Sequence, residues 1–210
     1  RRRHELMHRA EALLQIHLPE SSGALEAARK RLVFEEFFLL QLGLLLRKGA
    51  NEEELPGIAF RTDGAKPRAL RSALPFTLTS AQERAVREIE QDMRRDKAMS
   101  RLLQGDVGSG KTVVAGIALA HAVDNGLQGA IMAPTEILAE QHLQTLTSLF
   151  SSAGIQAVLL KGDMPAAAKR EAVAMIESGE ADVAVGTHAL IQDSVSFADL
   201  GLVVTDEQHR

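Results

Sequence analysis

Residues 105–112 have the composition and order of a phosphate-binding loop, because they match the pattern G-x-x-x-x-G-K-[ST] in full. Glycines in such a loop let the backbone curl, so that successive N–H groups point at phosphate oxygens. Lys111 would place a mobile cation on the β- and γ-phosphates, and the Thr112 hydroxyl would ligate Mg²⁺. A glycine-rich turn that binds nothing is disfavoured, because an apolar run precedes the loop and a helical pattern follows it. The motif predicts that ATP and Mg²⁺ bind at Gly105, Gly108, Ser109, Gly110, Lys111 and Thr112.

A second group of candidate residues follows an apolar run near the end of the chain, where Asp206 and Glu207 are adjacent. Asp206 is expected to hold Mg²⁺ through water, and Glu207 to orient or deprotonate an attacking water molecule. Two acids after a strand are on their own usually solvated turn residues. The phosphate loop earlier in the chain favours the functional interpretation. Lys111, Asp206 and Glu207 are therefore the predicted catalytic residues.

The elements that must position these residues are short apolar runs alternating with amphipathic helical stretches. This β-α-β rhythm predicts an α/β fold with a parallel sheet and helices on both faces. The strand at 200–205 would then deliver its two carboxylates to the carboxyl edge of the sheet, where ligands bind in open α/β folds. The expected strands are 101–104, 130–133, 158–160, 182–186 and 200–205, and the expected helices are 112–125, 136–150 and 165–178.

The first 75 residues have a different character. Helices are expected at 4–17 and at 24–48, where Gly49 would end the second helix. The second half of this helix is apolar nearly all round, so it is expected to be buried against another domain. Residues 1–50 are thus interpreted as a helical connector, residues 51–75 as a linker rich in Pro, Gly and charge, and residues 76–210 as the nucleotide-binding domain. Ser80 and Glu83 fit a capping box at the start of its first helix.

Composition restricts the possible classes of protein. The net charge is −4 and the sequence pI is about 6.0, without the basic excess usual in nucleic-acid-binding proteins. Trp and Tyr are absent, so stacking on bases would depend on seven Phe. With no Cys, the chain has no disulfide and no thiolate metal site, which fits a cytoplasmic location. No apolar run reaches the ~20 residues that span a bilayer, so no membrane partner is expected.

The tetrad Asp206-Glu207-Gln208-His209 resembles the second signature motif of the superfamily-two DExH helicases. Other segments follow the order of motifs in that family. Gln82, in the sequence Leu-Thr-Ser-Ala-Gln, resembles the upstream glutamine that reads adenine. Residues 133–142 look like the first DNA-contacting motif and residues 186–190 like the next. The resemblance is specific from about residue 74 to the end and weaker over residues 24–48.

The resemblance implies a RecA-like phosphate-loop NTPase fold for residues 76–210, as a C-terminally truncated first motor lobe preceded by the helical connector. It also implies a monomeric, ATP-driven DNA helicase that remodels replication forks and Holliday junctions in recombination and repair. His209 would couple hydrolysis to DNA contact, and Pro134, Thr135, Thr187 and His188 would lie near the DNA backbone. A wedge domain and a second motor lobe with an arginine finger would belong to a longer chain, so this part alone is expected to lack unwinding activity.

Several alternatives remain open at this point. The chain could belong to a motor of the transcription-repair coupling type acting on duplex DNA, although that type would be expected to carry Glu at the position of Gln208. It could also be a phosphate-loop ATPase that is not a helicase, or a binding module that keeps the fold. Gln82 and Thr135 could act as helix caps alone, and His188 could be a buried loop histidine. His121 and His142 lack an evident partner and are expected to be structural or exposed.

Overall fold

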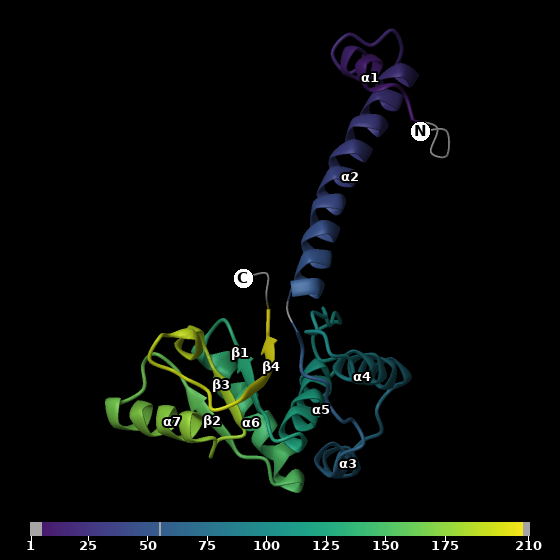
Figure 1. Ribbon diagram of the computed structural model, residues 1–210. Coiled ribbons are helices and arrows are strands. Elements are labelled where there is room, and N and C mark those ends of the chain that lie inside the picture. Colours follow the sequence, from purple (N-terminus) through teal and green to yellow (C-terminus); the bar gives the residue numbers. More distant parts are fainter. Residues whose placement is uncertain (1–5, 55, 208–210) are drawn as a thin grey trace. The chain divides into compact units, whose positions relative to one another are not determined.

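The computed structural model describes residues 6–54 and 56–207, which divide into two compact units on either side of the boundary between Pro56 and Gly57 (Figure 1). The first unit contains α1 (Arg9–Gln15) and α2 (Ser22–Glu54). Ala12 of α1 and Ala28 of α2 are fully buried where these helices pack together. Glu35 of α2 forms ion pairs with Arg9 and Arg31, with N···O distances of 3.2 and 2.9 Å. Small side chains and the Arg9–Glu35 ion pair thus hold the two helices together, whereas Arg31 belongs to α2 itself.

Helix α2 differs from its prediction in length, and its burial against another domain stays a prediction. It continues through Gly49 to Glu54, because one glycine within a helix costs only about 1 kcal/mol relative to Ala. Its apolar side chains are exposed in the part of the chain that is described: Phe37 is 61% exposed and Leu45 63%. The rings of Phe34 and Phe38 stack with centroids 6.2 Å apart. The apolar side chains of this half are therefore largely exposed among the described residues.

The expected linker at 51–75 contains a helix, α3 (Ala65–Ser72), which belongs to the second unit and packs against α5 (Lys111–Asp124). Its N-terminus is capped from a distance, since the Lys66 backbone N–H donates to Asp124 Oδ1 at 2.9 Å. Gly64 allows this approach, because a Cβ there would overlap the Asp124 carboxylate. The Pro and Gly that suggested a linker therefore shape the start of a helix.

All strand pairs in the four-stranded sheet are parallel, and the strand order is β2-β3-β1-β4. Each strand except β4 is followed by a helical segment, which confirms the expected β-α-β rhythm. The elements in chain order are α4 (Ser80–Met93), α5, β1 (Gln128–Met132), α6 (Glu136–Phe150), η1 (Ser151–Ala153), β2 (Ala157–Leu160), α7 (Ala166–Ser178), β3 (Val183–Gly186), η2 (His188–Ile191) and β4 (Leu200–Thr205).

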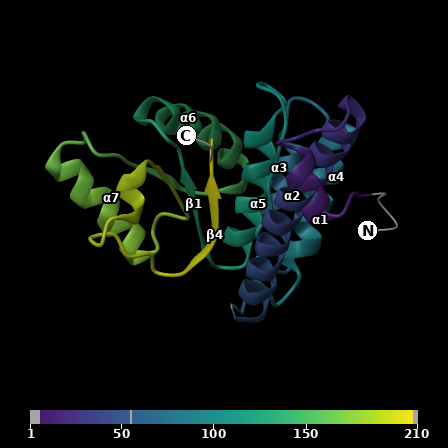
Figure 2. The same ribbon diagram turned by 90° about the horizontal axis from the view of Figure 1, so that it is seen from above.

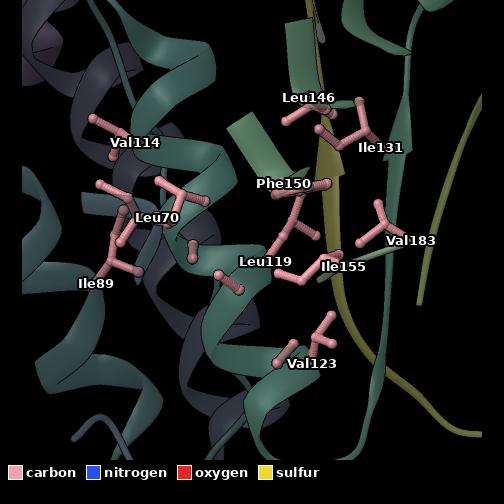
Figure 3. Packing of buried hydrophobic residues seen from close by; sticks show 14 of the residues in the cluster. Leu70, Ile89, Val114, Leu119, Val123, Ile131, Leu146, Phe150, Ile155 and Val183 are labelled. Atoms are coloured by element: carbon pink, nitrogen blue, oxygen red, sulfur yellow. The ribbon is translucent and has the colours of Figure 1, made fainter. Parts of the chain in front are cut away.

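Alternate residues of the strands face two different hydrophobic clusters. Val183 and Val185 of β3 pack with α5 and α6 on one face of the sheet, whereas Ala184 packs with α7 on the other. Seen from above, α5 and α7 lie on opposite sides of β1 and β4 (Figure 2). Figure 3 shows α5 between Leu70 and Ile89 on one side and Phe150 on the other. Helix α5 is therefore central to the core, and nine of its fourteen residues are buried.

The expected strand at 101–104 is not a strand in the structure. A strand requires a neighbour that pairs with its backbone N–H and C=O groups. Among the described strands, β4 is an edge strand that pairs only with β1, and none pairs with residues 101–104. The run has no regular secondary structure, and Leu102 is 77% exposed.

Candidate nucleotide-binding site

The topology brings the predicted site residues to one edge of the sheet. Helix α5 connects to β1 through a short turn at 125–127, so α5 runs opposite to the strands. Its N-terminus, where the phosphate loop ends, thus lies toward the carboxyl ends of the strands. Asp206 follows β4 at this edge, and its backbone N–H donates to the carbonyl of Met132, the last residue of β1, at 2.9 Å. The sheet edge thus carries both groups that the sequence singled out.

The phosphate loop has the backbone geometry that its glycines predict. Gly108 and Gly110 have φ angles of 79° and 81°, a left-handed conformation that costs a residue with a Cβ ~1–2 kcal/mol. Gly110 is the N-cap of α5, and no described side chain caps this helix. The Lys111 ammonium donates to the carbonyls of Gly105 at 2.7 Å and Asp106 at 2.9 Å. Lys111 thus contacts the loop through polar groups that a phosphate could replace.

Gln82 connects helix α4 to the phosphate loop. Its amide Nε2 donates to the carbonyl of Ser109 at 2.9 Å, and its Oε1 accepts from the Thr79 backbone N–H at 2.8 Å. The Thr79 hydroxyl in turn accepts from the Gln82 N–H, so these two residues form the capping box. The predicted box at Ser80 and Glu83 is wrong by one residue, because Thr79 is the residue with the extended backbone. Gln82 therefore combines a capping role with a loop contact.

An open cavity of about 480 Å³ lies between the end of α3 and the start of α4. Glu83, next to Gln82 in the chain, lines it and is fixed by Arg71, whose guanidinium contacts both carboxylate oxygens at 2.6 and 2.7 Å. Phe76, half exposed, contributes an aromatic face. The sequence interpretation missed this cavity, since half of its walls come from the end of the segment expected to be a linker.

Hydrogen bonds hold both oxygens of the Asp206 carboxylate. Oδ1 accepts from the Glu207 backbone N–H at 3.0 Å, and Oδ2 lies 2.7 Å from Nε2 of His142 on α6. Glu207 has a φ of 46°, in the left-handed region. His142 was expected to be structural or exposed, yet its side chain is only 15% exposed and contacts a predicted catalytic residue. The sequence did contain a signal, since His142 lies on the buried face of α6.

The oxygen ligands at this site suit Mg²⁺ bound together with a nucleotide, rather than a metal ion coordinated by protein side chains alone. Mg²⁺ is usually bound through one or two protein oxygens, with phosphates and water completing the shell. Asp206 and Thr112 offer one carboxylate and one hydroxyl of this kind. No group of three or more His, Cys, Asp or Glu gathers to form a metal site within residues 6–54 and 56–207. These residues therefore fit a metal that arrives with a nucleotide.

The predicted DNA-contacting residues also follow strands that end at this edge. Pro134 and the exposed Thr135 come after β1, and Thr135 caps α6 by accepting from the Leu138 N–H at 3.3 Å. Thr187 and His188 come after β3. His188 is exposed, so the alternative of a buried loop histidine is wrong. Gln208 and His209 lie outside the described residues.

Lys161 neutralises acidic side chains near the start of α6. Its ammonium lies 2.6 Å from Glu140 and 2.9 Å from Asp163. Hydrogen bonds to these carboxylates raise the pKa of Lys161 above its usual value, and the bond to Glu140 has the largest effect. The Asp163 backbone N–H also donates to Glu136 at 3.2 Å. The segment after β2 is thus tied to the N-terminal half of the helix that Thr135 caps.

The profile of the DEAD/DEAH box helicase family matches residues 79–210, more than half of the chain. The chain belongs to this family, whose members use ATP, and the resemblance to helicases expected from the motifs is confirmed. In the part of the chain that the structure describes, no helix is long and apolar enough to cross a membrane.

Among the relatives is the ATP-dependent DNA helicase RecG of Streptococcus pneumoniae, 48% identical over 208 residues, which are 99% of this chain and 31% of that protein. RecG of Bacillus subtilis is 49% identical over 200 residues, 95% of this chain and 29% of that protein. A solved structure of RecG bound to a three-way DNA junction is 43% identical, with a TM-score of 0.86 over 100% of this chain and 28% of that chain. The chain thus spans about three tenths of the length of these relatives.

Proposed function

We propose that this chain is the ATP-binding part of an ATP-dependent DNA helicase that remodels branched DNA, such as replication forks and Holliday junctions. The observation that carries the proposal is the convergence of the phosphate loop and the acidic end of β4 at one sheet edge. The near-half identity to RecG proteins supports DNA as the substrate. The solved RecG complex with a three-way junction supports a branched form.

In this proposal the phosphate loop binds the triphosphate. Lys111 exchanges the carbonyls of Gly105 and Asp106 for phosphate oxygens, and the N–H groups at the start of α5 bind the phosphates. Thr112 and Asp206 hold Mg²⁺, which supplies positive charge where negative charge develops in phosphoryl transfer. Glu207 orients or deprotonates the attacking water.

The base of the nucleotide is assigned to the region of Gln82. An amide can offer adenine one donor and one acceptor, which Gln82 uses for Ser109 and Thr79 in this structure. Adenine would replace at least one of these contacts. The half-exposed ring of Phe76 in the neighbouring cavity would offer an apolar surface to the base.

The DNA backbone is assigned to the loops after β1 and β3. Thr135 stands at the N-terminus of α6, where backbone N–H groups and the helix dipole favour phosphate. Pro134, Thr187 and the exposed His188 lie at the same sheet edge, and His209 would couple this contact to hydrolysis. Because the chain is acidic overall, these local contacts would supply only part of the DNA affinity.

The whole protein is proposed to be a cytoplasmic monomer in which a second motor lobe supplies an arginine and a wedge domain engages the junction. The first compact unit, α1 and α2, would connect the wedge domain to the ATP-binding lobe. The exposed apolar residues of α2 fit a helix that another domain covers.

The test is the ATPase rate of the full-length protein without nucleic acid and with single strands, plain duplex, branched DNA and structured RNA. Strong stimulation by branched DNA, abolished by Lys111→Ala, supports the proposal. Equal stimulation by plain duplex would favour the transcription-repair coupling type of motor. A rate that no nucleic acid changes would leave an ATPase with another purpose, and turnover retained in Lys111→Ala would refute the role of the phosphate loop.

A further inference from the structure

His142 is placed on α6 where an apolar residue would be expected. Ala139, Leu146 and Phe150 are fully buried, and together with His142 they follow the spacing of one helix face. His142 thus belongs to the stripe that packs against the sheet. Its imidazole meets the carboxylate of Asp206, 64 residues further along the chain, with 2.7 Å between Nε2 and Oδ2.

The contact has a defined direction. A carboxylate oxygen accepts hydrogen bonds, so Nε2 of His142 carries the hydrogen and donates it. Hydrogen bonds to a charged acceptor are shorter and stronger than neutral ones, in agreement with the short distance. The side chains of His142 and Asp206 are 15% and 29% exposed, so water competes little at the imidazole. Since the Glu207 N–H binds the other oxygen, the plane of the carboxylate is fixed at both ends.

We propose that His142 is a positioning residue that orients Asp206 for Mg²⁺ and links α6 to the metal site. The proposal rests on the proposed function, in which Asp206 holds the metal and the Thr135 end of α6 contacts DNA. No cluster of acidic or histidine ligands surrounds Asp206 among the residues described, so the orientation of one carboxylate has a large effect on metal binding. His142 lies seven positions after Thr135, about 10 Å along a rigid helix. A shift of α6 on DNA binding would therefore move the imidazole and the carboxylate together.

The test uses the full-length protein with His142→Leu, which keeps the volume but cannot donate, and His142→Gln, whose amide can. Exposed Gln144→Leu on the same helix is the matched control. Binding of a fluorescent ATP analogue is titrated with Mg²⁺ and repeated in EDTA, and the melting temperature is recorded. Loss of a residue that orients a metal ligand typically weakens metal affinity about 10- to 100-fold.

The expected result is a rise of about 10- to 100-fold in the Mg²⁺ concentration for half-maximal analogue binding in His142→Leu. Analogue affinity in EDTA and the melting temperature should stay near the wild type, and His142→Gln should restore most of the Mg²⁺ response. An unchanged Mg²⁺ response in His142→Leu, or an equal loss of analogue binding in EDTA, would overturn the proposal.

If His142→Leu does not fold, His142→Gln is compared with His142→Asn, whose shorter amide falls short of the carboxylate. Equal Mg²⁺ responses in these two variants would then refute the positioning role. A wild-type protein that fails to bind the analogue would instead contradict the proposed function itself, so the two failures are distinguishable.

Discussion

Gly110 has a left-handed backbone and lies close to Gln82, and its replacement by Ala tests both features. Its φ of 81° is left-handed, and a Cβ at this position would overlap Nε2 of Gln82. Gly126, at the other end of α5, has a φ of 78°, and a Cβ there would meet no described atom within 4 Å. Gly126→Ala thus reproduces the backbone strain without the collision and is the matched control.

Both variants should lose ~1–2 kcal/mol of stability to the left-handed backbone. In a domain of this size that corresponds to a melting temperature lower by roughly 2–8 °C. Gly110→Ala should in addition break the hydrogen bond between Gln82 and Ser109, a contribution of about 1 kcal/mol. If Gln82 reads adenine, its displacement also weakens ATP binding, by about tenfold for ~1.4 kcal/mol.

The assay is a titration of each variant with a fluorescent ATP analogue, beside thermal unfolding. We expect Gly126→Ala to bind the analogue like the wild type and Gly110→Ala to bind it at least about tenfold more weakly. Equal affinities in the two alanine variants, with equal melting temperatures, would show that Gln82 does not depend on the close approach at Gly110. The argument that links Gly110 to ATP binding through Gln82 would then be refuted.

Three other variants test the remaining features. Glu207→Gln should keep ATP binding but lower the hydrolysis rate by roughly 10²–10⁴-fold, and loss of binding would indicate a structural role instead. The buried amide of Gln128 donates to two carbonyls and accepts one N–H. Gln128→Leu should therefore lower the free energy of unfolding, measured in urea, by about 2–5 kcal/mol, and a loss below about 1 kcal/mol would contradict this. Burial lowers the pKa of His121, and this effect outweighs the hydrogen bond with Glu90, which raises it. As the pH falls below 6.5, the ordinary pKa of histidine, His121 therefore binds a proton in the unfolded chain before it does so in the folded one. Stability should therefore be retained above pH 6.5 and decline below it, and chemical denaturation at pH 5 and 8 should show a smaller difference in His121→Gln.

Local sequence patterns predicted the sheet and its helices well. The helix at 136–150 was placed with the bounds that α6 has, and α5 was placed one residue late at each end. Here the phosphate loop, an N-cap residue and the helical period all indicate the same element. The order of the motifs then placed the phosphate loop and Asp206 at one edge, because parallel strands share a direction.

Contacts between distant residues could not be predicted in this way. Helix α3 depends on burial of Leu70 and on a cap from Asp124, 58 residues away from Lys66. The hydrogen bond between His142 and Asp206 is equally remote in sequence. The run at 101–104 shows the converse, since its residues suit a strand but no described strand pairs with it. Such outcomes depend on which segments meet in space.

The edge position of β4 has a consequence for handling the chain. On its outer side, no described strand occupies the backbone N–H and C=O groups, and Leu200 and Val203 are 38% and 54% exposed. An open strand edge with apolar side chains can pair with the same edge of another molecule and begin aggregation. The hydrodynamic radius that light scattering gives for this chain alone should therefore increase with concentration, and a charged residue in place of Val203 should suppress that increase. Enzymatic measurements on this chain alone would need dilute solutions, so that low activity is not confused with aggregation.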